Sequence, residues 1–396
     1  VDSALKVGRS KDKTLLGQIA KAYQSYEDLK KSERVIDFED VLLLTVGMLE
    51  EDRQVRERVR EQYRYFTIDE YQDVSPLQQR LLNLWLGNRE DICVVGDASQ
   101  TIYSFAGATS AFLLNFTKRF PAAQTFHLTK GYRSTPEIIK SANSILRSAG
   151  VIGVETPELF TENANGAKPS IKEFADSKGE IAHVIGEISE AVKALSDIRE
   201  SSEIAILART NAQLENFAKE LSSQGIALQL KSAEKFFDRV EVKEAMREIR
   251  SASVIPSGND WLEDLQGVLR PFGDGEYVQA FLNLAKDMKA AGATSLRQYL
   301  RELEDRAEQN NPPAMPGVVL ATLHAAKGLE WERVFLVGAS DNYLPLQLGA
   351  NSSLAGKLES DIEEERRLFY VGITRARSNI QISYAGRPSP FLAALG

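Results

Sequence analysis

Residues 66–73 read Phe-Thr-Ile-Asp-Glu-Tyr-Gln-Asp. A short aromatic and β-branched run ends here in two adjacent carboxylates, Asp69 and Glu70, which is the pattern of a strand with a polar tip. A carboxylate pair at the C-terminal end of a buried strand suits nucleotide hydrolysis, because one carboxylate can hold Mg²⁺ while the other polarises the attacking water. A solvated turn after an apolar strand produces the same pattern, so the pair alone leaves both interpretations open.

Strands and helices alternate along the chain around this segment. Short apolar runs predict strands at 65–68, 92–95, 124–128, 171–174, 204–207, 318–322, 334–337 and 379–384. Apolar residues at helical spacing predict helices at 76–85, 109–120, 135–148, 179–195, 213–224 and 361–371. Repetition of strand, loop and helix is typical of a parallel sheet with helices on its faces, so the expected fold class is α/β.

Two regions depart from this alternation. Residues 14–62 have the spacing of helices, and helices are also expected at 261–269, 277–290 and 296–310, before a linker at Asn310-Asn311-Pro312-Pro313. We therefore expect two α/β domains with a helical insertion in the second. The expected boundaries are 1–122 for the first domain, 123–247 with 316–396 for the second, and 248–315 for the insertion.

Composition restricts the class of protein. The chain has 396 residues, 43% of them hydrophobic and 26% charged, which fits a globular protein of two or three domains. No apolar run approaches the length of a transmembrane helix, and the charged N-terminal residues do not resemble a signal peptide, so we expect a cytoplasmic protein. The net charge of −8 argues against a protein that coats nucleic acid through bulk charge, but it leaves room for a local basic groove.

The cysteine and histidine residues indicate neither a disulfide nor a zinc site. Cys93 is the single cysteine, which excludes an internal disulfide, and its place in Ile92-Cys93-Val94-Val95 predicts a buried strand and inert packing. The three histidines lie far from one another and from Cys93 in the sequence, so no zinc-type spacing occurs.

Four further segments follow predicted strands or begin helices, where ligands bind in open α/β sheets. Segment 96–108 carries the amide Gln100 and two alternating aromatics, Tyr103 and Phe105. Aromatics on a loop can form a stacking platform for unpaired bases, although two core aromatics beneath a surface loop would look the same.

The other three segments are 128–135, 321–331 and 363–376. The first contains a Tyr-Arg pair, suited to stacking on a base and binding a phosphate. A charged helix with Glu363 paired to Arg367 accounts for the start of the third segment, but not for its Gly-Ile-Thr-Arg end.

These five segments, in this order, resemble motifs II to VI of the UvrD/Rep/PcrA-type superfamily 1 DNA helicases. Segments 37–40, 207–213 and 235–243 also match the family, and the resemblance extends from about residue 36 to 377. Eight ordered matches argue against eight separate structural coincidences. The resemblance implies two RecA-like P-loop NTPase domains with parallel sheets, the first incomplete, and a short helical insertion in the second.

The resemblance also implies roles for individual residues, with ATP and Mg²⁺ as cofactors. At the phosphates of ATP, Asp69 would bind Mg²⁺, Glu70 would activate water, and Gln100 and Arg133 would contact the γ-phosphate. At the rest of the nucleotide, Tyr132 would stack on adenine, and Gly328 and Glu330 would lie at the ribose. Arg375 would be the arginine finger. At DNA, Tyr103 and Phe105 would stack on bases, and Arg209, Asn211 and His324 would contact the strand. Asp73 and Lys327 would hold the motif loops together.

The chain departs from the family at several places. Ala106 replaces an arginine, Gly131 replaces an asparagine, and the insertion is short. No G-x-x-x-x-G-K-[ST] phosphate loop occurs, so the sequence has the character of an internal fragment of a longer helicase. Without the phosphate-loop lysine and its backbone cradle, we expect negligible ATPase from this chain alone.

The function implied is an ATP-dependent 3′–5′ helicase or translocase on single-stranded DNA, in repair or replication. Its partners would be single-stranded DNA and duplex junctions, with no membrane association, and its location the cytoplasm, at the nucleoid. Two alternatives stay open: a non-catalytic nucleic-acid-binding or scaffold protein, and the helicase part of a recombination helicase–nuclease.

Overall fold

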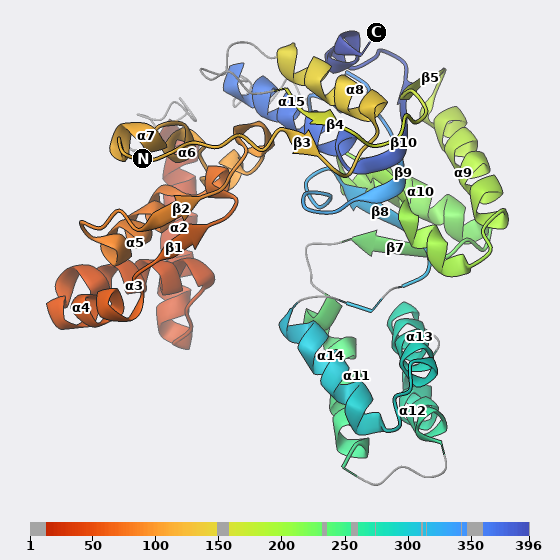
Figure 1. The fold of residues 1–396 in the computed structure, drawn as a ribbon, viewed down its shortest axis with the longest axis horizontal. Helices are drawn as coiled ribbons and strands as arrows, with labels where there is room; N and C mark the ends of the chain where they lie inside the picture. The colour runs from red at the N-terminus through yellow and green to blue at the C-terminus, as the bar shows by residue number, and fades with distance from the viewer. Residues whose placement is uncertain are drawn as a thin grey trace.

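The computed structural model describes residues 13–148, 158–231, 236–254, 260–273, 275–309, 312–313, 315–341, 343–346 and 359–395. They form three groups of secondary structure (Figure 1). The N-terminal group comprises residues 13–120, the sheet group residues 130–231 with 315–395, and the helical group residues 236–309. All sheets are parallel, which confirms the predicted α/β class. No helix in the described ranges is long and apolar enough to cross a membrane.

The sheet group is built on six parallel strands in the order β5-β10-β9-β6-β8-β7. Their bounds are β5 Ser170–Phe174, β6 Ile204–Ala208, β7 Leu228–Lys231, β8 Val318–Thr322, β9 Trp331–Leu336 and β10 Ala376–Ala385. The inner strands are almost continuously apolar, because helices cover both faces of the sheet.

Strand β6 shows how the two faces are filled. Ala205 and Leu207 join the core cluster that contains residues of α8 (Pro136–Arg147) and α15 (Glu359–Ile373). The alternate residues of β6 join the core with α9 (Ser177–Lys193) and α10 (Asn211–Ser223). Because β6 and β8 are parallel neighbours, the loops that follow them lie at the same edge of the sheet.

The N-terminal group contains a two-stranded parallel sheet of β1 (Phe66–Ile68) and β2 (Ile92–Val94). Its helices are α2 Lys13–Glu33, α3 Phe38–Glu51, α4 Arg53–Gln62, α5 Pro76–Leu86, α6 Ala111–Leu114 and α7 Phe116–Arg119. Capping boxes begin two of them, Asp37 with Asp40 at α3 and Ser75 with Gln78 at α5. Three short 3-10 turns follow the strands: η1 Tyr71–Asp73, η2 Ala98–Gln100 and η3 Ser104–Ala106.

Three predictions for the N-terminal region are wrong. Cys93 is exposed, because helices do not cover both faces of the two-stranded sheet. Residues 124–128 form no strand, and Phe126 is 79% exposed, because no strand of the described ranges pairs with them. The expected helix 109–120 is two short helices that meet at Asn115, whose side chain donates to the carbonyl of Ala111 at 2.8 Å.

Three short elements and one helix were not predicted. Strands β3 (Lys130–Gly131) and β4 (Phe160–Thr161) pair in parallel, and β7 forms the edge of the large sheet. Helix α11 (Val240–Ala252) packs with α12 (Trp261–Leu269), α13 (Glu276–Ala290) and α14 (Leu296–Glu308). These helices share a core with Phe236 and Phe237, so the helical group begins nearer the sheet than residue 248.

The helical group joins the sheet through two neighbouring strands, β7 and β8. The buried Gln229 donates to the carbonyls of Met315 and, at 3.4 Å, Gly317, which ties the returning chain to β7. The predicted linker lies here; its residues 310 and 311 are outside the described ranges. The expected domain boundaries remain a prediction.

Candidate nucleotide and nucleic-acid site

The carboxylate pair lies where β1 ends. Glu70 adopts the left-handed conformation, with φ 50° and ψ 40°, which is unfavourable for a residue with a side chain. The Asp69 carboxylate stabilises this turn by accepting from the Glu70 amide at 2.9 Å. Both residues are exposed, so the turn presents two carboxylates to solvent beyond the strand.

A buried glutamine joins the tips of β1 and β2. The Gln72 side chain is 1% exposed, donates to the Glu70 carboxylate and accepts from the Asp97 amide at 3.0 Å. Asp97 also accepts from the Gln100 side chain at 2.9 Å. The two predicted phosphate-site residues, Glu70 and Gln100, therefore belong to one hydrogen-bonded network.

Lys327 brings the sheet group to this network. It follows β8, and its amine is 3.2 Å from the Glu70 carboxylate, pairs with Asp73, and donates to the Gln100 carbonyl at 3.1 Å. The same amine lies 5.4 Å from the centroid of the Tyr103 ring. Burial raises the pKa of Asp73, and the charge of Lys327 opposes that shift. One cation thus connects the predicted catalytic carboxylate with a predicted DNA-stacking ring.

Arg133 and Glu330 are paired with each other. The Arg133 guanidinium donates to the Glu330 carboxylate and, at 3.3 Å, to the Thr374 carbonyl. Burial acts to raise the pKa of Glu330, but Arg133 and then Arg377 outweigh it and hold that pKa below its ordinary value. Glu330, predicted at the ribose, therefore neutralises the charge of Arg133, which is predicted at the γ-phosphate.

Tyr132 and Gly328 lie near this pair in sequence. Tyr132 is 78% exposed, so its ring is accessible to a stacking partner, and the Lys130 amine lies over the ring at 5.4 Å from its centroid. Gly328 has φ 81°, a conformation that favours glycine, and it allows the chain to turn between Lys327 and Glu330.

Arg375 is buried rather than presented to a ligand. It is 3% exposed, and its guanidinium donates to the carbonyls of Val371 and Leu329, at 3.0 and 3.1 Å, and to the Thr374 hydroxyl. Burial lowers the pKa of Arg375 to about 10, with a further contribution from the nearby charge of Arg133. All of these acceptors are neutral.

Another arginine, Arg367 of α15, reaches the N-terminal group. Arg367 donates to the Thr101 carbonyl at 2.8 Å, next to Gln100, and burial lowers its pKa. From helical spacing alone, Arg367 is expected on a charged helix face, paired with Glu363. Helical spacing contains no signal that distinguishes an arginine facing solvent from one facing another domain.

The predicted stacking residues come together with a histidine from the sheet group. The Phe105 ring centroid lies 6.1 Å from that of Tyr103 and 5.8 Å from that of His324. The Tyr103 hydroxyl donates to the His324 carbonyl at 3.3 Å, and Phe105 is 71% exposed. The alternating aromatics are therefore a partly exposed ring cluster, with Phe105 outside the core.

The other two residues predicted at DNA differ from each other. Arg209 makes a bidentate ion pair with Glu365 of α15, at 2.7 and 3.0 Å, so its charge is already compensated. Asn211 is exposed at the start of α10. Burial lowers the pKa of His324 to about 4, with Arg209 as the second cause, so the imidazole is neutral at pH 7.

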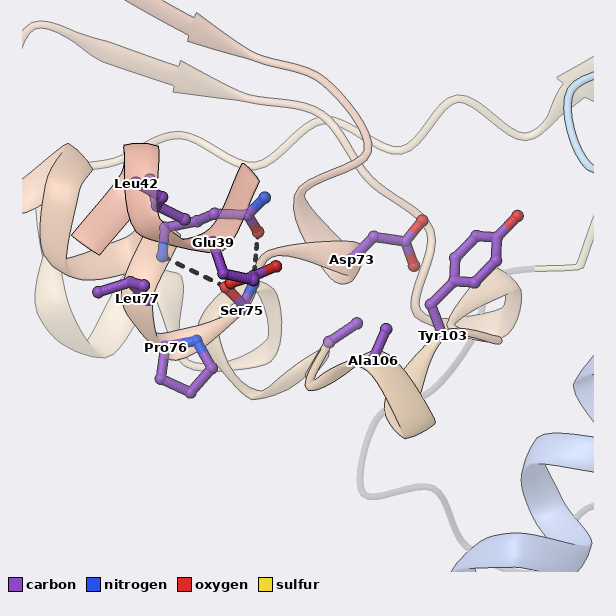
Figure 2. A pocket seen from close by; sticks show the side chains of 10 residues that line it. Glu39, Leu42, Asp73, Ser75, Pro76, Leu77, Tyr103 and Ala106 are labelled. Atoms are coloured by element: carbon purple, nitrogen blue, oxygen red, sulfur yellow. Dashed lines mark hydrogen bonds between the residues drawn. The ribbon is translucent and has the colours of Figure 1, made fainter. Parts of the chain in front are cut away.

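A cavity of about 510 Å³ adjoins the ring cluster (Figure 2). Asp73, Tyr103 and Ala106 line one part, and Glu39 and Leu42 of α3 line another. Ala106, which stands where the resembling family has arginine, leaves this wall without a cation. Segment 37–40 matches the resembling family, but the sequence did not predict that its residue Glu39 would line this cavity.

Two family models match nearly the whole chain. The model for the UvrD/REP helicase N-terminal domain matches residues 3–121, and the model for the UvrD-like helicase C-terminal domain matches residues 126–253 and 274–387. The interruption of the second match falls in the helical group.

Individual proteins match over the same length. The ATP-dependent DNA helicase UvrD2 of Mycobacterium tuberculosis H37Rv is 41% identical over 391 residues, covering 94% of this chain and 55% of its own length. The ATP-dependent DNA helicase PcrA of Staphylococcus aureus Mu50 is 25% identical over 464 residues, covering 93% of this chain and 62% of its own. The chain thus spans little more than half the length of these curated relatives.

A solved C-terminal domain of a possible DNA helicase from Lactobacillus plantarum WCFS1 aligns with 67% of this chain and 94% of its own. The identity is 16% and the TM-score is 0.33, which is too low to support an argument about the fold.

Proposed function

The chain belongs to the UvrD-like helicase family, and on this premise we propose that it is the motor part of an ATP-dependent DNA helicase. The relatives that match it are named ATP-dependent DNA helicases, which supports ATP as the energy source and DNA as the substrate. The finer proposal is 3′–5′ movement on single-stranded DNA and at duplex junctions, in repair or replication, in the cytoplasm at the nucleoid.

The carboxyl end of β1 is proposed as the hydrolytic centre. Asp69 fits a Mg²⁺ ligand, because Mg²⁺ on a nucleotide takes one or two carboxylates with phosphate oxygens, and its carboxylate is exposed. The bound ion would neutralise charge on the phosphates. Glu70 orients and deprotonates the attacking water, and Gln100 contacts the γ-phosphate. The described residues contain no cluster of three or more metal-ligating side chains.

The base and ribose of ATP are assigned to the sheet group. Tyr132 offers an exposed ring for adenine, and Gly328 and Glu330 lie at the ribose. Because Glu330 is paired with Arg133, we propose that nucleotide binding replaces this pair, and Arg133 then reaches the γ-phosphate.

Arg375 and Arg367 are two candidates for the cation that stabilises the transferring phosphoryl group. Family resemblance favours Arg375. Geometry favours Arg367, because it lies against the segment that follows Gln100, while Arg375 is buried among neutral acceptors. The assignment to Arg367 rests on its hydrogen bond to the Thr101 carbonyl.

The observation that carries the proposal is the position of Lys327. Its amine contacts Glu70, Asp73 and the Gln100 carbonyl and lies over the Tyr103 ring. Any change at the phosphates therefore acts on a residue that also touches the base-stacking cluster. This is the physical link that a translocase needs between hydrolysis and grip on DNA.

The 396-residue chain by itself is proposed to be inactive in ATP hydrolysis. Its sequence contains no phosphate-loop motif, so the lysine and backbone amides that bind the β- and γ-phosphates are not supplied by these residues. A measurable ATPase of this chain that Glu70→Gln abolishes would overturn this part of the proposal.

The decisive experiment uses the complete reading frame that contains this chain. We expect ATP hydrolysis stimulated by single-stranded DNA, and unwinding of a duplex with a 3′ tail but not of one with a 5′ tail. Glu70→Gln should abolish both while ATP and DNA still bind. DNA binding without hydrolysis in the unmodified protein would support the scaffold alternative instead.

A further inference from the structure

Segment 101–104 of the N-terminal group rests on the sheet group at every residue. Arg367 donates to the Thr101 carbonyl at 2.8 Å. Ile102 is fully buried in the core that contains residues of α8 and α15. The Tyr103 hydroxyl donates to the His324 carbonyl at 3.3 Å. The segment that carries the base-stacking rings belongs to the N-terminal group but is thus attached to the sheet group.

Ser104 is held by a single carboxylate of α15. Its amide donates to one oxygen of Glu364 at 3.0 Å, and its hydroxyl donates to the other oxygen. Hydrogen bonds to a carboxylate are stronger than neutral ones, and two bonds from one residue restrict the rotation of the backbone at that residue. Ser104 lies between Tyr103 and Phe105, so this restriction sets the relative direction of the two rings.

We propose that Glu364 is the positioning residue of the base-stacking pair. It holds Ser104 so that Tyr103 and Phe105 present their rings as one platform to single-stranded DNA. This inference rests on the proposed function, since it takes the ring pair to be the base-binding surface. It adds that the platform is assembled only while α15 is docked on the N-terminal group.

The Tyr103 hydroxyl anchors one of the two rings on the His324 carbonyl at 3.3 Å, but among the described residues only Glu364 bonds both the amide and the hydroxyl of Ser104, between the rings. Phe105 is 71% exposed and has ring contacts but no polar anchor of its own. Ile102 and Arg367 keep the segment attached to the sheet group without fixing the residues that follow. Loss of Glu364 should therefore disturb the geometry of the rings and leave the fold intact.

The test uses the 396-residue chain and a thymine oligonucleotide with 2-aminopurine at successive positions, without ATP. Stacking on a ring quenches the fluorescence of this base, so the wild type should show quenching on binding. We expect Glu364→Ala to weaken binding about threefold to tenfold, which is near the smallest effect that loss of one base stack produces. The variant should also lose much of the quenching. The matched control is Glu363→Ala, because Glu363 pairs with Arg366 on the same helix, at 3.3 Å.

A second variant, Ser104→Ala, removes one of the two bonds to Glu364 and little volume. It should lose part of the quenching, and the double variant with Glu364→Ala should be no worse than Glu364→Ala alone. Wild-type quenching and affinity in Glu364→Ala and Ser104→Ala would overturn the inference while leaving the DNA site standing. If the wild-type chain neither binds nor quenches the probe, the proposed DNA site fails, and the inference with it.

Discussion

Lys327 and Glu70 form an ion pair between the sheet group and the N-terminal group, with 3.2 Å between the amine and the carboxylate oxygen. The Lys327 side chain is 8% exposed and also pairs with Asp73, whose side chain is 20% exposed. The proposed catalytic base is thus already opposite a cation from the other group. Binding of nucleotide would have to redistribute these charges, which is a direct route from the phosphates to the contact between the groups.

Replacing Lys327 with methionine should destabilise the chain. Asp73 would keep its partly buried carboxylate and lose its cation, at a cost of about 2–3 kcal/mol in the free energy of unfolding. The double variant with Asp73→Asn should regain most of this loss, because both charges are then absent. Thermal unfolding followed by circular dichroism measures the three variants. An unchanged midpoint in Lys327→Met would contradict the role given to the pair.

Phe105→Ala should weaken binding of single-stranded DNA with little effect on stability. The exposed ring contributes stacking rather than core packing, so about 1–3 kcal/mol of binding free energy should be lost. Fluorescence anisotropy of a labelled oligonucleotide provides the affinity. Phe126→Ala, at another exposed phenylalanine, is the matched control and should bind as the wild type does. A large fall in the thermal midpoint of Phe105→Ala would instead place the ring in the core.

The two arginines of the α15 region should respond differently to replacement by alanine. Arg375→Ala should cost about 2–4 kcal/mol of stability, because it empties a buried site and leaves carbonyl groups without donors. Arg367→Ala should lower the rate of ATP hydrolysis in the complete protein by about a thousandfold, with a smaller effect on stability. Hydrolysis rates and melting curves of both variants separate the assignments. If Arg375→Ala is stable and lowers the hydrolysis rate more than Arg367→Ala does, Arg375 is the arginine finger, as the family resemblance implies.

Stability should fall as the pH decreases from about 6.5 to about 4, in part through His324. The pKa of His324 in the folded chain is about 4, so in this window the unfolded chain takes up a proton that the folded chain does not. Burial is the main cause, and the positive charge of Arg209 adds to it, while Glu365 opposes it. His324→Gln should show a shallower decline in thermal midpoint over this pH range. His127→Gln, at an exposed histidine, is the control and should follow the wild-type curve.

Cys93 should react with a thiol reagent in the folded protein. Its exposure in the two-stranded sheet predicts rapid modification of one thiol per chain without denaturant. Cys93→Ser should abolish the signal. Modification that occurs only after unfolding would show that this face of the sheet is covered in solution.

Elements of both the sheet group and the helical group were predictable from local pattern. The expected strand at 318–322 coincides with β8, and the expected helix at 261–269 coincides with α12. These elements have strong apolar periodicity and lie in cores, where burial and local preference agree. The strand expected at 124–128 has apolar residues at alternate positions but no ladder partner in the described ranges. Pattern alone does not reveal whether a partner strand exists.

For the candidate site too, some features follow from the sequence and others only from the tertiary structure. The sequence by itself determined which side chains are proposed to carry the chemistry, since the carboxylates, the amide, the aromatics and the arginines lie in ordered segments after strands or at helix ends. Only the tertiary structure decided their partners: Lys327 at Glu70, Glu364 at Ser104, and the carbonyls of Val371 and Leu329 at the buried Arg375. The physical reason is that a strand end or helix start is encoded by neighbouring residues. A contact between domains depends on groups more than 200 residues apart, and no local periodicity records it.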